Sequence, residues 1–292
     1  MTDVLAVLEV PRSSYYDSRK SRLPTRRRGQ PPPGYSFNTK GEQVSDEIII
    51  GHLKDYRSDV FMSVEGGAKV LSKYFKRDHQ IIVNHKKLAR LCKQQGLQLK
   101  QRSRKKSKFS SPSKNHSIVR ANQVWEFDLK YGYLHGERRF FFLVAFIDVF
   151  TREIRGWYLG RHCKAHDILS TLKIALDKHA INPEMGLTIR SDNGPQMRAS
   201  SFAEALAGLP ASHEFIPLRT PNKNAHIESF FSIYDLHLQQ QYFWDLRGAY
   251  HWTLEFMDYY NEVRIHGSLG MSPRAFGEQK ELHSEERFMQ AI

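Results

Sequence analysis

The longest apolar run in the chain, from Phe140 to Ile147, has the length of a single β-strand. A run without polar alternation is typical of a strand that is buried on both faces. It is also far shorter than the ~20 apolar residues that a membrane-spanning helix requires. The run therefore predicts a β-sheet with further structure packed on both of its faces, and it argues against a membrane segment.

The segments on either side of this run have strand and helix patterns of their own. From Val124 to Tyr131, large apolar residues alternate with Glu126, Asp128 and Lys130, as in a strand with two different faces. The other expected elements are strands over 139–149, 153–159, 187–191 and 214–218 and helices over 165–179, over 201–207 and from about 224. Three consecutive strands followed by alternating helices and strands predict a mixed α/β sheet with flanking helices.

The net charge of +13 is distributed unevenly along the chain. Residues 1–120 contain 26 Lys and Arg against 10 Asp and Glu, whereas residues 121–292 contain 18 against 21. This asymmetry favours a front half that binds a polyanion and a rear half with a different task. A basic tail that only promotes solubility is the alternative.

Cysteine usage and the first residues indicate the compartment. Cys92 and Cys163 lie far apart and form no CxxC motif, which argues against a disulfide scaffold and against a cysteine-rich zinc site. The N-terminus lacks the basic start and the long apolar stretch of a secretory signal. A reduced, cytoplasmic location is therefore expected.

The basic front half divides into three segments. Residues 1–44 combine a short N-terminal helix with a basic, proline-rich linker, whose composition cannot bury a core. Residues 45–99 have helical patterns that begin near Ser45, near Gly67 and at HKKLARLCKQQG, with a turn expected at residues 77–79 before the last of them. Residues 100–120 hold eight Lys and Arg and no acid, which is typical of a flexible linker that contacts phosphates without reading sequence.

The third of these helical patterns has an apolar stripe, Leu88, Leu91 and Cys92, opposite a basic face. This is the shape of a small all-α helix-turn-helix domain whose last helix enters the major groove of DNA. A basic helix face is often simply solvated, and that alternative stays open. The candidate DNA contacts are Lys86, Lys87, Arg90 and Lys93 on the helix and Arg104, Lys105 and Lys106 in the linker.

Three carboxylates stand out by their place in the expected sheet. Asp128 lies within its first strand, on the face opposite the bulky neighbours. Asp192 ends the strand over 187–191, and Glu228 lies near the start of the long helix, with 35 residues between the two acids. Reactions at phosphodiesters need charge stabilised on two oxygens, and two divalent ions held by carboxylates provide it. Asp148, within AFIDVF, is expected to be structural.

Four motifs make the sequence recognisable. They are VWEFDLKY around Asp128, SDNGPQ around Asp192, NAHIESFFS around Glu228 and YNEVRIHGSLGMSPRAF over residues 260–276. With the spacing of 35 residues, they resemble the insertion-sequence transposases of the retroviral-integrase (DDE) superfamily, in the group whose catalytic protein is encoded by the second of two overlapping frames. VLEVPRSSYY and NHKKLARLCKQQGL also match that pattern, so the resemblance spans nearly the whole chain.

The resemblance implies a ribonuclease-H-like catalytic core over residues 121–280, followed by a tail over 281–292. In such a core, Asp128, Asp192 and Glu228 hold two Mg²⁺ ions, for which Mn²⁺ can substitute. The implied activity is metal-dependent DNA cleavage and strand transfer at transposon ends.

The resemblance also implies contacts with DNA and with other proteins. Asn193, Gly194 and Asn224 would shape the pocket beside the metals, whereas Arg264 and His266 either contact phosphate or tie the C-terminal turn to the core. The implied partners are double-stranded DNA, as transposon ends and as target, further copies of the chain in a dimer or higher multimer, and a protein from the upstream frame. When bound to DNA, the protein would associate with the nucleoid.

The motifs depart from the family pattern at three positions. Asp235 stands seven residues after Glu228, where a basic DNA contact is common, Lys223 replaces an acid, and Phe127 replaces a threonine. None of these changes removes a candidate metal ligand, so they affect the expected DNA contacts rather than the class of reaction. Two alternatives stay open: a catalytically inactive integrase-like DNA-binding protein and a nuclease of the ribonuclease-H type.

Overall fold

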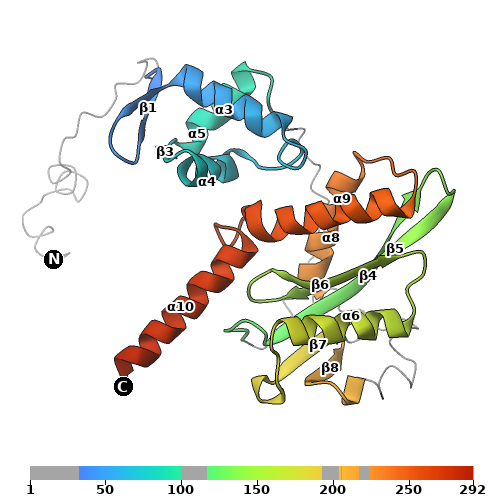
Figure 1. Ribbon diagram of the computed structural model, residues 1–292. Coiled ribbons are helices and arrows are strands. Elements are labelled where there is room, and N and C mark those ends of the chain that lie inside the picture. The colour runs from blue at the N-terminus through green and yellow to red at the C-terminus, as the bar shows by residue number, and fades with distance from the viewer. Residues whose placement is uncertain (1–32, 100–116, 193–203, 205, 217–223, 292) are drawn as a thin grey trace, which may run out of the picture.

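The computed structural model of the 292-residue chain describes residues 33–99, 117–192, 204, 206–216 and 224–291, with side chains up to residue 282 (Figure 1). Several predicted features lie outside these ranges. They are the helix before residue 33, the basic residues Arg104, Lys105 and Lys106, and Asn193 and Gly194. In the described part of the chain, no helix combines the length and the apolar character needed to cross a membrane.

The C-terminal part of the structure, residues 117–291, is built on a five-stranded mixed sheet with the order β6-β5-β4-β7-β8. Its strands are β4 (Val124–Leu134), β5 (Arg139–Asp148), β6 (Ile154–Gly160), β7 (Leu187–Ser191) and β8 (Ala211–Phe215). Strands β4, β5 and β6 form an antiparallel meander, and β7 and β8 continue the sheet parallel to β4. The order confirms the mixed, ribonuclease-H-like sheet that the sequence predicts.

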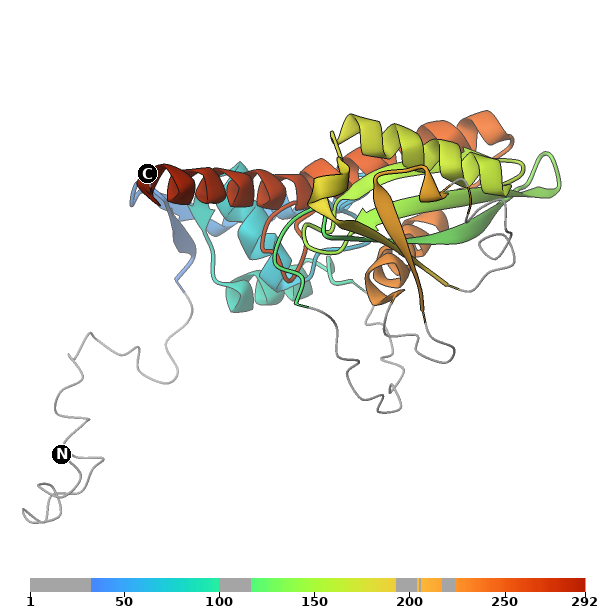
Figure 2. The same ribbon diagram turned by 90° about the horizontal axis from the view of Figure 1, so that it is seen from below.

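Helices cover both faces of this sheet (Figures 1 and 2). Helix α6 (Ala165–Lys178) packs on one face, over Trp125 and Phe146. Helices α8 (Ala225–Leu238) and α9 (Leu246–Asp258) pack on the other face. Strand β5 contributes side chains to both hydrophobic cores, so its apolar run is buried on both sides as predicted.

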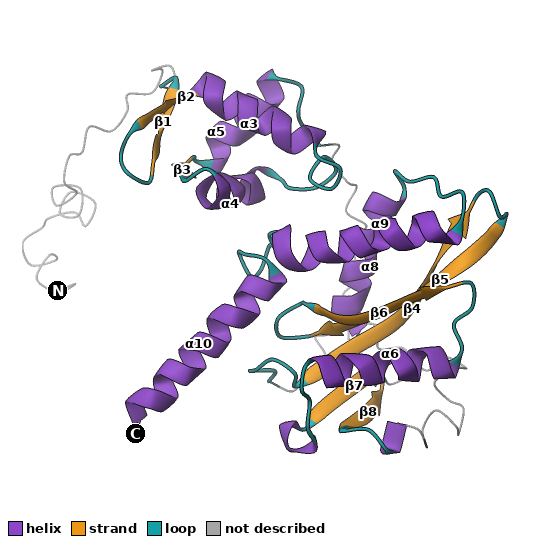
Figure 3. Ribbon diagram, in the orientation of Figure 1, coloured by secondary structure: helices purple, strands orange, loops and turns teal. Residues whose placement is uncertain are grey.

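The N-terminal part, residues 33–99, combines three helices with a small sheet (Figure 3), so the prediction of an all-α unit is wrong. The helices α3 (Asp46–Ser58), α4 (Ala68–Asp78) and α5 (His85–Gln94) confirm the three helical segments. The sheet has the order β2-β1-β3 and consists of β1 (Tyr35–Asn38), β2 (Gln43–Ser45) and β3 (Ile81–Ile82).

The hairpin of β1 and β2 falls in the segment that the sequence predicts as linker. The side chain of Asn38 closes its turn by accepting hydrogen bonds from the amides of Lys40 at 3.0 Å and Glu42 at 2.9 Å. Gly41 takes the left-handed backbone that the turn requires, with φ of 86°. Strand β1 then pairs with β3, which is distant in sequence, and strands this short have no periodicity from which to predict them.

Three element boundaries also differ from the prediction. Strand β8 begins at Ala211 rather than Glu214, because its first residue pairs with Leu187 at the start of β7. Helix α4 continues through Asp78, where the sequence predicts a turn. Helix α10 (Pro273–Ala291) runs through the boundary predicted at residue 280, so the expected tail continues a helix.

Candidate active site

Strand β4 turns its polar side chains toward helix α8. Trp125 and Phe127 of β4 pack under α6, so the residues that alternate with them, Glu126, Asp128 and Lys130, lie on the opposite face of the sheet. Backbone amides at the start of α8 bind Glu126, and Lys130 pairs with Asp235 of the same helix. The face predicted for Asp128 is therefore confirmed.

Asp192 and Glu228 come from the neighbouring elements. Strand β7 runs parallel to β4, with Glu126 opposite Arg190. Two residues further along the two strands, Asp128 and Asp192 reach the same level of the sheet. Glu228 lies in the first turn of α8, which packs beside β4. The three carboxylates thus approach one another from a strand, a strand end and a helix.

The carboxylates interact electrostatically. The pKa of Asp128 is raised to about 6, mainly by burial and in addition by the negative charges of Asp192 and Glu228. A hydrogen bond from the Leu129 amide to its Oδ1 atom, at 2.7 Å, acts in the opposite direction. Burial also raises the pKa of Glu228. Carboxylates that destabilise one another's charge in this way favour a bound cation.

The donor set suits a hard divalent cation. All three side chains offer carboxylate oxygens, the ligand type that Mg²⁺ and Mn²⁺ prefer. Among the residues that the structure describes, no three His, Cys, Asp or Glu side chains are close enough together to hold an ion as they stand. The residues therefore fit a divalent metal by chemistry and by charge, and a shift of side chains is needed to complete the coordination.

A fourth carboxylate, Glu126, holds the start of α8 against the sheet. Its buried Oε2 atom accepts hydrogen bonds from the amides of His226 at 2.9 Å and Ile227 at 3.1 Å, and its Oε1 atom lies 3.6 Å from Arg190. Burial raises the pKa of Glu126 to about 7, against the effect of these contacts. At this position a carboxylate accepts hydrogen bonds from amides that have no acceptor within the helix. Its negative charge also interacts favourably with the positive end of the helix dipole.

The sequence motifs predict no separate role for Glu126. Its place two residues before Asp128, in the polar half of the alternation, was the available signal. It shares its task with Asn224, which is buried and donates from Nδ2 to the carbonyl of Phe127 at 3.3 Å. Both side chains thus link the helix that carries Glu228 to the strand that carries Asp128. That Asn224 also shapes the pocket beside the metals stays a prediction.

The acid that departs from the family pattern has a partner on the sheet. Asp235 accepts a hydrogen bond from Lys130 Nζ at 2.6 Å, and the two side chains are 35% and 31% exposed. Lys130 lies two residues after Asp128 on the same face of β4. A basic side chain therefore lies at this edge of the acidic site, but it is Lys130 of strand β4 and not a residue of helix α8.

The predicted DNA contacts on α5 fall into two groups. Lys87 forms an ion pair with Asp46 and donates to a backbone carbonyl of β1 at 2.6 Å, and Arg90 lies 3.6 Å from Asp46. Both basic side chains are therefore paired within the N-terminal part. Lys86 and Lys93 are exposed, so they are the basic side chains of this helix that a DNA phosphate could reach.

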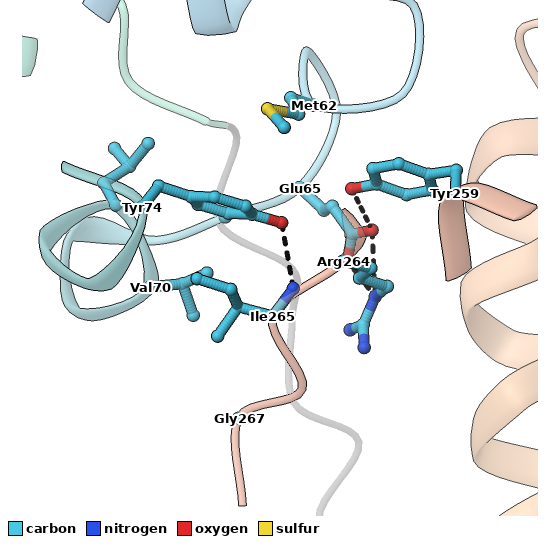
Figure 4. A pocket seen from close by; sticks show the side chains of 10 residues that line it. Met62, Glu65, Val70, Tyr74, Tyr259, Arg264, Ile265 and Gly267 are labelled. Atoms are coloured by element: carbon cyan, nitrogen blue, oxygen red, sulfur yellow. Dashed lines mark hydrogen bonds and ion pairs between the residues drawn. The ribbon is translucent and has the colours of Figure 1, made fainter. Parts of the chain in front are cut away.

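For Arg264 and His266, the contacts favour the structural alternative over phosphate binding. Arg264 is mostly buried, and its Nε atom donates to both carboxylate oxygens of Glu65 at 2.9 and 2.8 Å (Figure 4). The half-buried His266 donates from its backbone amide to the carbonyl of Met271 at 2.9 Å, and its Nδ1 atom lies 3.0 Å from Ser268 Oγ. Arg264 thus connects the C-terminal signature to the N-terminal part.

Asp148 has the structural role that is expected from the sequence. It is fully buried and accepts hydrogen bonds from the amides of Asn122 at 2.6 Å, Phe150 at 2.8 Å and Thr151 at 2.7 Å. The bonds from Phe150 and Thr151 close the turn between β5 and β6, and the bond from Asn122 ties the segment before β4 to this turn.

The fold has distant likenesses among solved structures. The catalytic core domain of HTLV-2 integrase in complex with magnesium, in a trimeric form, is 16% identical with a TM-score of 0.39, over 55% of this chain and 98% of that one. The catalytic domain of Mos1 mariner transposase is 16% identical with a TM-score of 0.40, over 47% of this chain and 70% of that one.

Sequence comparison gives closer relatives. A transposase for the insertion element IS904 from Lactococcus lactis is 27% identical over 250 residues, 80% of this chain and 95% of that protein. A 31 kDa protein of IS600 from Shigella sonnei is 30% identical over 223 residues, 69% of this chain and 78% of that protein. A 39.2 kDa protein of IS476 from Xanthomonas euvesicatoria is 29% identical, and the chain spans only 55% of its length.

Family models agree with these relatives. Two models of the integrase core domain match the chain, one over residues 119–221 and the other over residues 210–273. Together they cover more than half of the chain and include all three candidate ligands. The chain therefore belongs to the insertion-sequence transposases of the DDE integrase superfamily, a family of polynucleotidyl transferases.

Proposed function

We propose that the chain cuts DNA strands at transposon ends and joins them to target DNA. The observation that carries this proposal is the approach of Asp128, Asp192 and Glu228 from three elements, with the charge on Asp128 disfavoured by the other two. Such a site repels a polyanion such as DNA until cations neutralise it, which supports a metal-dependent reaction at phosphodiesters.

The three carboxylates are proposed to hold two Mg²⁺ or Mn²⁺ ions. Asp128 and Asp192 would share one ion, and Glu228 would complete the site of the second. Bound ions supply stabilisation of negative charge on the attacking and leaving oxygens. The chain itself contributes placement, since Asp128 lies on a central strand and Glu228 lies on a helix that Glu126 and Asn224 hold to that strand.

The proposed substrate is double-stranded DNA, both as transposon ends and as target. The excess of bases in residues 1–120 and the exposed Lys86 and Lys93 support this role. A transposon has two ends that are processed together, so a dimer or higher multimer belongs to the proposal. A protein from the upstream frame and a location on the nucleoid in the DNA-bound state also belong to it.

A strand-transfer assay with the purified full chain tests the proposal. Labelled duplexes copied from the ends of the DNA element that encodes the chain, with free 3′-hydroxyls, are incubated with supercoiled plasmid and Mg²⁺, Mn²⁺ or EDTA. We expect joined product with either metal and none with EDTA. Asp192→Asn should lower joining by at least about 100-fold, since one carboxylate charge at the metals is lost.

Asp177→Asn is the matched control, because it makes the same change on the exposed face of α6. It should join DNA like the wild type. Joining that persists in EDTA or in Asp192→Asn would contradict the proposed metal site. If DNA is cut but never joined, the nuclease alternative is favoured. If the chain binds DNA without cutting, even when fused to the upstream-frame protein, the inactive relative is favoured.

A further inference from the structure

One carboxylate joins the N-terminal and C-terminal parts of the structure. Glu65, in the loop between α3 and α4, accepts hydrogen bonds from Tyr259 Oη at 2.8 Å and from Arg264 Nε, and its Oε1 atom lies 3.3 Å from His237 Nε2. Figure 4 shows Tyr259 and Arg264 converging on Glu65 across the boundary between the two parts. All three partners belong to the C-terminal part, and the Glu65 side chain is only 14% exposed.

Apolar and backbone contacts surround this carboxylate. The ring of Phe61 stacks on Tyr259 with 4.9 Å between centroids. Ile265 leaves the C-terminal part and is buried in the hydrophobic core of the N-terminal part, where its amide donates to Tyr74 Oη at 3.0 Å. Arg77 of α4 donates to the carbonyl of Val263 at 2.6 Å. The contacts run from residue 61 to 77 on one side and from 237 to 265 on the other.

Among the described residues, the side chains that pair with the Glu65 carboxylate all come from the C-terminal part. Burial acts to raise its pKa, but the hydrogen bond from His237 and the charge of Arg264 hold the pKa below the usual value. Glu65 is therefore ionised at neutral pH while it is buried. A buried carboxylate and a buried guanidinium are costly to separate. The pair of Glu65 and Arg264 therefore resists any opening of the contact between residues 61–77 and residues 237–265, which we call the joint.

Helix α8 connects this joint to the candidate active site. Glu228 lies in its first turn and His237 in its last, nine residues apart, which is about 13 Å along a helix axis. On the other side of the joint, α4 packs against α5, the helix with the exposed Lys86 and Lys93. Packed elements therefore connect Glu228, a candidate metal ligand, with the exposed lysines of α5.

We propose that Glu65 is a positioning residue that fixes the distance between α5 and Glu228. DNA held by α5 then meets the acidic site in one register, so the cleavage position is set by the joint. The part of this inference that concerns DNA rests on the proposed function, whereas the fixed distance does not depend on it.

Distance measurements between spin labels test the joint directly. Labels are attached to the full chain at Gln94→Cys on α5 and Lys173→Cys on α6, both exposed positions. We expect one narrow distance distribution in the wild-type background and a broad one with Glu65→Gln or with Tyr259→Phe, which removes a single partner. A broad wild-type distribution, or a narrow and unchanged one in Glu65→Gln, overturns the proposal.

Two features of the chain provide controls for this measurement. Glu137→Gln breaks another paired contact between a Glu and an Arg, in which Arg161 donates to both oxygens of Glu137 at 2.8 and 2.7 Å within the C-terminal part. It should leave the distance narrow, and broadening there overturns the assignment to Glu65. Cys92 and Cys163 are buried, one in each part, so unreactive thiols show that both parts of a variant are folded.

Cleavage mapping tests the consequence for DNA. With element-end duplex and Mg²⁺, the wild type and Glu137→Gln should cut at one position, and Glu65→Gln should cut at several neighbouring positions. A merely destabilising change would lower the yield without spreading the cuts. A single unchanged position in Glu65→Gln overturns the link between joint and register. If the wild type cuts nothing, the proposed function fails, while the spin-label distances still decide the joint.

Discussion

The ion pair of Lys130 and Asp235 places a basic side chain beside the acid that departs from the family pattern. The pair lies at the edge of the acidic site, and about one-third of each side chain is exposed. An exposed pair of this kind contributes only about 0–1 kcal/mol to folding. The Lys130 ammonium group has further protons to donate while it is paired with Asp235. Lys130 is therefore still able to contact a DNA phosphate near Asp128.

Lys130→Met should therefore weaken DNA binding with little loss of stability. If Lys130 contacts one phosphate, the slope of log affinity against log salt falls by about 1. Fluorescence anisotropy of labelled duplex at several salt concentrations measures this slope. Arg161→Met, which breaks the exposed pair with Glu137, is the control and should leave the slope unchanged. An unchanged slope in Lys130→Met would limit this residue to its partner Asp235.

His179 makes folding sensitive to acid. Its Nδ1 atom lies 3.2 Å from Arg155 Nη1, a permanent donor, so the ring is neutral and donates from Nε2 to the Arg155 carbonyl at 3.2 Å. Burial, together with the Arg155 charge, lowers the pKa of His179 to about 4 from the ordinary 6.5. Between these two values the unfolded chain binds a proton that the folded chain does not bind.

The free energy of unfolding should therefore fall as pH drops from about 6.5 to 4, and the contribution of His179 should be constant above that window. His179→Gln should flatten this dependence by up to about 1.4 kcal/mol per pH unit, the amount for one proton. Urea unfolding at several pH values measures it. His251→Gln, at an exposed position on α9, should keep the wild-type slope. Equal slopes in both variants would show that His179 is protonated in the folded state.

At the scale of elements, the contact between α6 and β6 depends on the absence of a side chain. A Cβ atom at Gly156 in β6 would lie 2.8 Å from the Cβ of Ala175 in α6, closer than these atoms can approach. Gly51 in α3 is the opposite case, because a Cβ there meets nothing within 4 Å. The same substitution should therefore have opposite effects in the two elements.

Gly156→Ala should destabilise the fold by about 1–3 kcal/mol, because the helix must move away from the sheet. Gly51→Ala should stabilise it by about 0.5–1 kcal/mol, because alanine restricts the unfolded chain and favours a helix. Chemical denaturation of the two variants beside the wild type checks both signs. A stabilising Gly156→Ala would mean that α6 is not packed closely on β6.

At the scale of the whole molecule, the exposed lysines of α5 belong to the N-terminal part and the acidic site belongs to the C-terminal part. Lys87 and Arg90 pair with Asp46, so Lys86 and Lys93 are the lysines of α5 for which contact with DNA is proposed. Changing Lys86 and Lys93 together to Ala should lower the salt slope of DNA binding by about 2. Changing Lys87 alone should instead lower the melting temperature, since Asp46 loses its ion pair. The reverse pattern would place Lys87 at the DNA.

The sequence by itself determined the layered α/β architecture and the three acids. The alternation in β4 predicted its two faces, the apolar run predicted a strand buried on both sides, and the motif spacing indicated Asp128, Asp192 and Glu228. These features could be predicted because they depend on local periodicity and on motifs that lie within a few residues of each other. The family membership followed from the same motifs.

Only the tertiary structure decided which polar groups meet. Four features unite residues from different elements. They are the hairpin of β1 and β2, the contact of α8 with Glu126, the pair of Lys130 and Asp235, and the joint at Glu65. An isolated Glu or Arg has the same local pattern whether it is solvated, caps a helix or lies buried in an ion pair. The packing of distant elements selects among these outcomes, because burial removes water and leaves each charge only the partners that the fold brings to it.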